Sequence, residues 1–267
     1  MEFQFFPLDI EYKVVDGKPV VYLFGRTIDS QQICVIDDSF RPYFWVIPKI
    51  NADLKSKIKR LFVEKDNVKL EVTSVEEIKK KFNEKDVIAL KVTVNLPKAV
   101  PEIRAILRDW DDIDSVNEYD ILFTRRYLID KGITPLTALT VKGVSVPEKL
   151  KVPGIKAESI EQLNDNILKS PKIVALDIET YSPHGKMGSP NKDPIIMLAL
   201  YGSNDYKKVI TWKKFKAPEK YVEFVDSEAD LLDRFKELIE ELKPDFITGY
   251  FSDGFDMPYL KARAEKL

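Results

Sequence analysis

The sequence predicts an α/β (α+β) protein in two parts, and three observations support this fold class. Two strand-like runs, Asp9–Val15 and Pro19–Phe24, flank Asp16-Gly17, a dipeptide typical of tight hairpin turns. Segments with helical spacing of apolar residues alternate with further strand-like runs. Near the end of the chain, three strand-like runs precede one amphipathic helical pattern and a fourth strand, which suits a mixed sheet covered by helices.

The first part reads as a mixed β/α domain over residues 1–132. Its further elements are a strand at Gln32–Ile36, an edge or bend at Pro42, predicted helices at 52–64 and 74–82, and a strand at Val87–Val94. The second of these helices opens with Ser74-x-x-Glu77, a capping-box pattern. A last helix has Pro101 at its first position, where proline is favoured.

Residues 133–170 read as a connecting segment, because three prolines interrupt it and periodic structure is weak. A short helix is predicted at 159–168 from the pattern Ser159-x-x-Gln162. The second part, 171–267, has strands at Lys172–Asp177, Ile195–Tyr201, Lys207–Trp212 and Asp245–Tyr250, and a helix that begins at Ser227. The final helical pattern has no stop signal, so we expect the second domain to be truncated.

Composition excludes several classes of protein. Charged residues make up 32% of the chain and hydrophobic ones 44%, and no stretch approaches the roughly 18 apolar residues that a membrane helix needs. The single Cys34 excludes an internal disulfide framework, and the acidic start is unlike a signal peptide, so we expect a cytoplasmic protein. The net charge of −2 does not show whether the chain binds nucleic acid.

Acidic residues at two places are candidate metal ligands. Asp177 and Glu179 are two apart at the end of a predicted strand, so they project from the same face and repel each other unless a cation is present. Oxygen ligands of this kind suit Mg²⁺ or Mn²⁺. Asp256 comes before Pro258 at the start of a predicted helix, where it could equally be a helix cap. Acids that simply face water at a strand end remain an alternative for the first pair.

Several segments resemble family B DNA polymerases of the archaeal type. Val174–Thr180 is similar to the first exonuclease motif of that family and Tyr250–Leu260 to the second. The similarity continues in Pro194–Met197 and Val209–Trp212, and in the first part in the segments Phe40–Tyr43, Glu118–Ile121 and Arg126–Gly132.

The resemblance implies that the second part is a partial RNase H-like 3′→5′ exonuclease domain that uses two divalent metals, Mg²⁺ or Mn²⁺. By position, Asp177, Glu179 and Asp256 correspond to its metal-binding and catalytic acids. Phe251 stands where the family usually has asparagine, which removes a polar contact near the substrate. The family's third motif, Tyr-x-x-x-Asp, does not follow Asp256 within the sequence. We therefore expect the chain alone to be catalytically incompetent.

The resemblance also implies a pocket in the first domain that recognises uracil in the template strand. The residues similar to that pocket are Tyr12, Pro42, Tyr43, Pro97, Val100, Ile121, Phe123 and Arg126. Tight apolar walls exclude the methyl group of thymine, and stacking offsets the cost of flipping the base out. Arg126 either braces this pocket or contacts phosphate. Without the resemblance, these residues would be read as ordinary packing.

The family implies single-stranded template DNA and a primer 3′ end as partners, a sliding clamp that binds outside this sequence, and work at the archaeal nucleoid. Two alternatives remain. One is a free-standing DnaQ-like exonuclease, and the other is a DNA-binding relative of the polymerases that has lost catalysis. His184, the single histidine, is expected at the surface.

Overall fold

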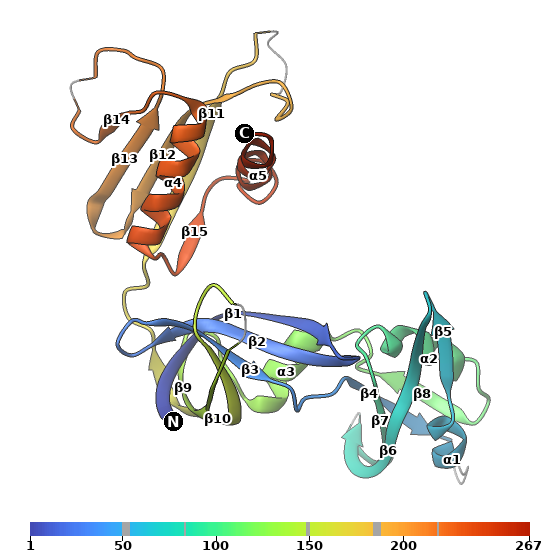
Figure 1. The fold of residues 1–267 in the computed structure, drawn as a ribbon. Coiled ribbons are helices and arrows are strands. Elements are labelled where there is room, and N and C mark those ends of the chain that lie inside the picture. Colours follow the sequence, from blue (N-terminus) through green and yellow to red (C-terminus); the bar gives the residue numbers. More distant parts are fainter. Residues whose placement is uncertain (50–53, 83, 148–149, 184–187, 218) are drawn as a thin grey trace. The chain divides into compact units, whose positions relative to one another are not determined.

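The computed structural model describes residues 1–49, 54–82, 84–147, 150–183, 188–217 and 219–267. Their backbone forms two compact units, Met1–Leu168 and Lys169–Leu267 (Figure 1). Both units combine β-sheets with a few helices, which confirms the predicted fold class. His184 lies outside the described residues.

Five strands of the first unit close into a barrel. Their order is β1-β2-β3-β10-β9, with bounds β1 (Glu2–Val15), β2 (Lys18–Thr27), β3 (Gln32–Asp37), β9 (Thr137–Val146) and β10 (Gly154–Ile167). The predicted hairpin between β1 and β2 is confirmed: Asp16 and Gly17 both have positive φ, as a two-residue primed turn requires. Helix α3 (Phe123–Lys131) packs Phe123 and Tyr127 into the apolar core of the barrel.

The prediction of a connecting segment with a short helix at 133–170 was wrong. Residues 137–146 and 154–167 form β9 and β10, which pair with each other and complete the barrel. The supposed capping residue Gln162 instead accepts a hydrogen bond from the backbone N–H of Thr134 at 2.9 Å. Pairing with β1 and β3 supplies a ladder of backbone bonds, and this outweighs a local helix signal.

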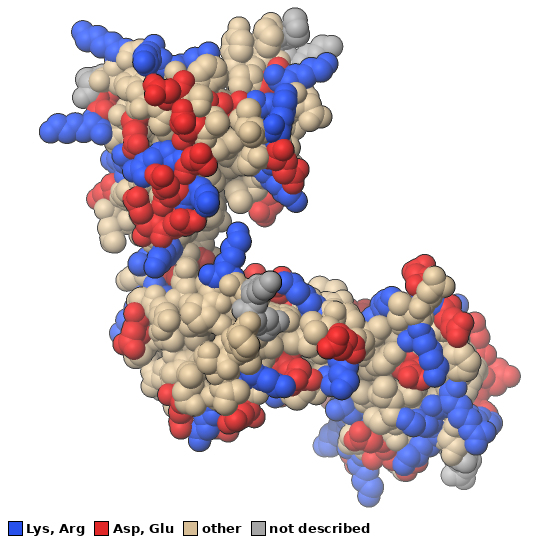
Figure 2. All heavy atoms as spheres, in the orientation of Figure 1, with Lys and Arg blue, Asp and Glu red and all other residues tan. Residues whose placement is uncertain are grey.

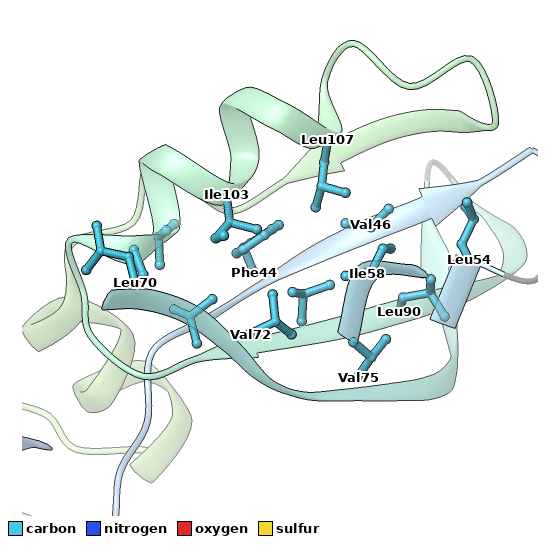
Figure 3. Packing of buried hydrophobic residues seen from close by; sticks show 14 of the residues in the cluster. Phe44, Val46, Leu54, Ile58, Leu70, Val72, Val75, Leu90, Ile103 and Leu107 are labelled. Atoms are coloured by element: carbon cyan, nitrogen blue, oxygen red, sulfur yellow. The ribbon is translucent and has the colours of Figure 1, made fainter. Parts of the chain in front are cut away.

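A second sheet of the first unit has the order β5-β6-β7-β4-β8. Its strands are β4 (Tyr43–Pro48), β5 (Phe62–Lys65), β6 (Val68–Phe82), β7 (Lys85–Val94) and β8 (Ile113–Asn117). Helices α1 (Leu54–Lys59) and α2 (Ala99–Leu107) pack on one face, where Phe44, Val46 and Leu90 meet Ile58 and Ile103 (Figure 3). Trp45 and Ile47 belong to a separate apolar cluster, because alternate residues of a strand point to opposite faces.

The helix predicted at 74–82 was also wrong. These residues belong to β6, which pairs with β7 from Ser74 opposite Thr93 to Phe82 opposite Lys85. Strand β7, which is rich in β-branched residues, supplies backbone hydrogen-bond partners along the whole segment, and these stabilise a strand more than a capping box stabilises a helix here. Of the helix predicted at 52–64, only 54–59 is helical, 62–64 is in β5, and 52–53 lie outside the described residues. Helix α2 begins at Ala99, two residues before Pro101.

The second unit is a mixed sheet with helices, as predicted. The order is β14-β13-β12-β11-β15, with bounds β11 (Ile173–Thr180), β12 (Ile195–Gly202), β13 (Tyr206–Thr211), β14 (Val222–Phe224) and β15 (Phe246–Thr248). A 3₁₀ turn, Ser203–Asp205, joins β12 to β13. Strands β11, β12 and β13 are antiparallel, whereas β15 runs parallel to β11.

Two helices complete the core of the second unit, α4 (Glu228–Leu242) and α5 (Asp256–Lys266). Helix α4 lies along the sheet in Figure 1 and buries Leu231 and Leu238 against Leu198. The predicted start of α4 is confirmed, since the Ser227 hydroxyl accepts the Asp230 N–H at 3.2 Å. In the described part of the chain, no helix is long and apolar enough to cross a membrane.

Candidate nucleic-acid pocket and nuclease site

The first unit contains a pocket of about 470 Å³ beside the barrel. All the residues predicted from the sequence to form a base pocket line it: Tyr12, Pro42, Tyr43, Pro97, Val100, Ile121, Phe123 and Arg126. Lys98, Pro101, Tyr119, Asp120, Leu122 and Thr124 complete the lining, although none of them was predicted to belong to the pocket. Each of them is a close neighbour in the sequence of a predicted pocket residue, and this proximity is the feature of the sequence that could have indicated them.

The walls of this pocket are largely apolar and rigid. The ring of Tyr12 contacts that of Phe123 edge-on, with the centroids 5.0 Å apart. Val100 lies in the first turn of α2, where its N–H donates to the Pro97 carbonyl at 3.2 Å. Val100 is 8% exposed, so its side chain has little room to move away from a ligand. Proline rings and a short helical turn therefore hold the shape of the pocket.

Arg126 lines the pocket and is held by several contacts within the first unit. Its side chain is buried, and its Nη2 lies 2.7 Å from the Glu118 carboxylate and donates to the Glu118 carbonyl at 3.3 Å. The guanidinium also lies 4.9 Å from the centroid of the Tyr43 ring. The Tyr43 hydroxyl donates to Asp130 at 2.7 Å. Of the two predicted roles for Arg126, these contacts fit bracing, because the charge is already paired inside the unit.

Two groups of this network have shifted pKa values. Burial opposes ionisation of Glu118, but hydrogen bonds from Arg126 and Lys80 outweigh it and lower the pKa of that carboxyl. Burial, followed by the hydrogen bond to Asp130, raises the pKa of the Tyr43 hydroxyl. Glu118 is therefore an anion and Tyr43 a neutral donor around neutral pH, as the bracing contacts require.

The second candidate site lies at the end of β11. Asp177 and Glu179 are both exposed on one face of the strand, as predicted, while Leu176 before them and Ile178 between them are buried in the core with residues of the helices. Opposite them on β12 are Ala199 and Met197. The two carboxylates therefore stand on the sheet face that does not hold the core.

Asp256 lies beside the same strand but is buried at the first position of α5. Its Oδ1 accepts the backbone N–H of Ile178 at 3.2 Å. The chain reaches this place through Gly249, where a Cβ would come 2.6 Å from the Leu176 carbonyl, so only glycine allows the close approach. β15 pairs with β11 only at residues 173–175, and the Asp256 carboxylate accepts a backbone N–H of β11 further along the strand, at Ile178.

The three acids have the oxygen-donor chemistry that Mg²⁺ or Mn²⁺ prefers. Two of them share a face, and Asp256 is within a hydrogen bond of the residue between them. However, within the described residues, no group of three Asp, Glu, His or Cys side chains is placed to hold a metal ion together. Asp177, Glu179 and Asp256 therefore do not form a closed metal site in this arrangement.

Phe251, which replaces the family's usual asparagine, has a left-handed backbone with φ of 57°. Its ring lies against Gly254, where a Cβ would come within 2.3 Å of the ring. The side chains of Tyr250 and Phe251 are 99% and 67% exposed. Two aromatic rings therefore face solvent in the loop that leads to Asp256.

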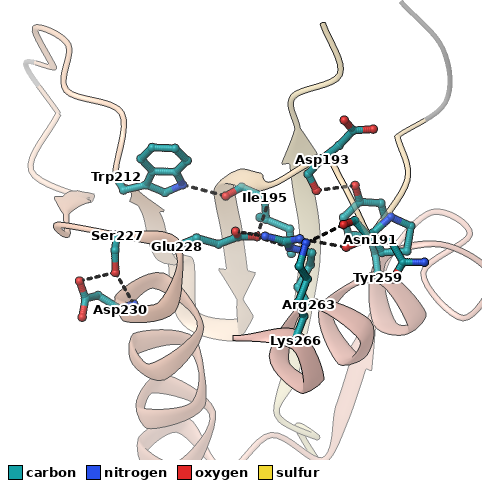
Figure 4. Close-up of polar contacts among 11 residues, drawn as sticks. Asn191, Asp193, Ile195, Trp212, Ser227, Glu228, Asp230, Tyr259, Arg263 and Lys266 are labelled. Carbon is teal, nitrogen blue, oxygen red and sulfur yellow. Dashed lines mark hydrogen bonds and ion pairs between the residues drawn. The ribbon is translucent and has the colours of Figure 1, made fainter. Parts of the chain in front are cut away.

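A buried polar network, not foreseen from the sequence, holds the loop after β11 against α5 (Figure 4). Glu228 accepts the Ile195 N–H at 2.8 Å and the Arg263 Nε at 2.7 Å, and its second oxygen accepts from Arg263 Nη2. Arg263 Nη1 donates to the Pro190 carbonyl at 2.9 Å, and the Tyr259 hydroxyl to the Asp193 carbonyl at 2.9 Å. The helix that begins with Asp256 is thereby tied to the loop that follows Glu179.

Charged side chains of both signs share the visible surface. On the face drawn in Figure 2, lysine and arginine side chains are interspersed with aspartate and glutamate. This mixing agrees with the formal net charge of −2.

Comparison with known proteins identifies the class of domain that contains the second site. Residues 115–267 match the family model described as "DNA polymerase family B, exonuclease domain", so the acidic strand belongs to an exonuclease-type domain. The chain is 35% identical to a DNA polymerase of Pyrococcus glycovorans over 97% of its own length and 29% of that protein. It is 33% identical to a DNA polymerase of Thermococcus kodakarensis over 97% of this chain and 13% of that protein.

A solved structure, the family B DNA polymerase from the hyperthermophilic archaeon Pyrobaculum calidifontis, is also similar. It superposes with a TM-score of 0.78 at 30% identity, over 98% of this chain and 32% of that one. The present chain belongs to the family B DNA polymerases. It spans about three tenths of the length of the Pyrococcus polymerase and of the solved structure.

Proposed function

We propose that this chain is the template-reading and proofreading portion of a DNA-directed DNA polymerase, and that its pocket binds uracil in single-stranded DNA. The observation that carries the proposal is the convergence of Tyr12, Val100, Phe123 and the other predicted residues around one pocket. These residues come from distant parts of the chain, so packing of neighbours along the sequence does not account for their meeting.

Discrimination follows from shape. A flipped base enters between the proline rings and Val100 and stacks near the Tyr12–Phe123 pair, which offsets the cost of unstacking it from the strand. Uracil and thymine differ by one methyl group, and a tight apolar wall such as buried Val100 leaves no space for it. Arg126 keeps Tyr43 in position, so the polar side of the pocket does not yield when a base enters.

The test is a fluorescence-anisotropy titration of the 267-residue chain with two single-stranded oligonucleotides that differ only in one uracil or thymine. Tighter binding of the uracil strand supports the proposal. Equal affinity for the two strands contradicts it, even if both bind well, because electrostatic binding to phosphates carries no base information.

For the second unit, we propose that Asp177, Glu179 and Asp256 contribute to a 3′→5′ exonuclease site that holds Mg²⁺ or Mn²⁺. When bound, such ions activate water and neutralise charge on the phosphodiester. In this chain, Asp177 and Glu179 offer exposed oxygens on one face, and Asp256 is held by the Ile178 amide. A primer 3′ end is the proposed substrate, and polymerisation itself belongs to the whole protein.

We expect the chain alone to have little nuclease activity, because its described residues do not gather three acids around one point. The measurement is release of nucleotides from a labelled 3′ end with Mg²⁺ and with Mn²⁺. Rapid release that Asp177→Ala abolishes would overturn this expectation. Release that survives Asp177→Ala would instead point to a contaminating nuclease.

A further inference from the structure

A second cavity, of about 210 Å³, lies on the face of the second sheet that α1 and α2 do not cover. Its lining is mostly apolar with a few charged groups: Trp45, Ile47, Lys80, Lys81, Phe82, Val87, Ala89, Asn117 and Glu118. It is smaller than the roughly 300–1,000 Å³ typical of drug-sized ligands, so a single ring suits it better.

Trp45 gives the cavity an unmet hydrogen-bond donor. The residue is 9% exposed, and its Nε1 is buried without a hydrogen-bond partner among the described residues. Buried donors are nearly always paired, and one left unpaired is unfavourable. An occupant with an acceptor atom would satisfy it.

The charges around the cavity favour a neutral occupant. Lys80 Nζ lies 4.0 Å from the centroid of the Trp45 ring and 3.3 Å from the Glu118 carboxylate. The cation is thus already paired, and Glu118 repels a phosphate. The walls at Ile47, Val87 and Ala89 are apolar. A planar, uncharged ring that carries a carbonyl or ring-nitrogen acceptor fits these groups, and a nucleobase is such a ring.

The cavity adjoins the proposed uracil pocket through shared residues. Glu118 bonds both Lys80 of the cavity and Arg126 of the pocket. The rings of Trp45 and Tyr43 meet edge-on with centroids 5.8 Å apart, and Tyr43 lines the pocket. We infer that the cavity at Trp45 binds a second nucleobase of the same single strand whose flipped base occupies the first pocket. This inference rests on the proposed binding of single-stranded DNA.

The experiment measures anisotropy with a uracil-containing strand in which each neighbour of uracil is replaced, one at a time, by an abasic nucleotide. Trp45→Phe keeps an aromatic ring but removes the N–H, and Trp110→Phe is the control, since Trp110 packs against the α1–α2 core instead. We expect Trp45→Phe to weaken binding of the intact strand about 3- to 10-fold, the range of one hydrogen bond, and Trp110→Phe to have no effect.

An abasic nucleotide at one particular position should weaken binding by the wild-type chain to a similar extent. For the strand with that abasic position, the wild-type chain and Trp45→Phe should bind with equal affinity. Unchanged affinity of Trp45→Phe, or equal losses at every abasic position, would overturn the inference. If Trp45→Phe does not fold, Ala89→Val narrows the same cavity and should give the same pattern. Failure of the uracil proposal is seen separately, as equal binding of uracil and thymine by the wild-type chain.

Discussion

Single buried carboxylates tie the helices of this chain to its sheets. Asp37, at the end of β3, is 5% exposed and accepts hydrogen bonds from the Tyr127 hydroxyl at 2.9 Å and from the Ser39 N–H at 2.8 Å. Lys131 lies 3.4 Å away. Burial opposes ionisation of Asp37, but the bonds from Ser39 and the charge of Lys131 outweigh it and lower its pKa.

This lowered pKa predicts acid sensitivity of the first unit. A carboxyl whose pKa is lower in the folded state stabilises it above the unfolded value, about 3.9, and the effect is lost as the pH falls through the folded pKa. Asp37→Asn should reduce the free energy of unfolding by about 1.5–3 kcal/mol at pH 7. As the pH falls below about 4, the difference between the two proteins should shrink progressively. Urea unfolding over this pH range measures it, and a constant difference would refute the assignment.

Phe251 is the second residue with a measurable consequence. A left-handed backbone costs a residue with a side chain about 1–2 kcal/mol, whereas asparagine adopts it readily. Because the Phe251 side chain is 67% exposed, little burial is lost on replacement. Phe251→Asn should therefore raise the stability of the second unit by about 0.5–1 kcal/mol. Thermal unfolding measures the change.

The control for Phe251 is its neighbour Tyr250, which is 99% exposed and does not have a positive φ. Tyr250→Asn should leave the melting temperature nearly unchanged. A loss of stability in Phe251→Asn larger than that in Tyr250→Asn would show that the ring of Phe251 on Gly254 stabilises the loop more than its backbone strains it.

At the scale of elements, strands proved harder to predict than helices with strong caps. The start of α4 was read correctly, because Ser227 and the apolar stripe of that helix act locally. In β6 and β10, similar capping patterns were misleading. The backbone hydrogen bonds that make these segments strands are formed with β7 and β9, which lie elsewhere in the sequence. Local pattern does not report a distant partner strand.

A buried ion pair between Glu228 of α4 and Arg263 of α5 joins two elements of the second unit. Glu228→Gln keeps an acceptor for the Ile195 N–H but leaves Arg263, which is 5% exposed, without its anion. Breaking such a buried pair costs about 3–5 kcal/mol. We expect that loss in denaturant unfolding of the second unit.

A matched comparison is Glu223→Gln, which disrupts the more exposed contacts to Lys208 at 2.9 Å and Arg234 at 2.8 Å. Each exposed pair of this kind contributes no more than about 1 kcal/mol. Equal losses of stability for Glu223→Gln and Glu228→Gln would mean that the buried pair contributes no more to holding α4 and α5 together than an exposed pair does.

At the scale of the whole molecule, the boundary between the units falls after Leu168, not at residue 132. A chain cut at 132 lacks β9 and β10 and leaves β1 and β3 with unpaired edges. We predict that residues 1–168 fold cooperatively, whereas residues 1–132 do not. Circular dichroism melting of the two polypeptides tests this, and a cooperative transition in the shorter one would contradict the role of the barrel closure.

The placement of the candidate residues at both sites was more predictable than that of the residues around them. Asp177 and Glu179 were placed on one face because strand geometry alone requires it. The base pocket was predicted residue by residue from the family resemblance, and its members do line one pocket. The Glu228–Arg263 pair and the Trp45 cavity were not predicted, since both join residues far apart in sequence whose types are common elsewhere.

The central claim is that the pocket reads uracil by excluding a methyl group, and Val100 tests it most directly. The measurement is the ratio of affinities for uracil and thymine strands, in the wild-type chain and in Val100→Leu, which adds one methylene to the wall. We predict a ratio well above one for the wild type and near one for the variant, through weaker binding of the uracil strand alone. A wild-type ratio of one, or a ratio unchanged by Val100→Leu, would contradict the claim.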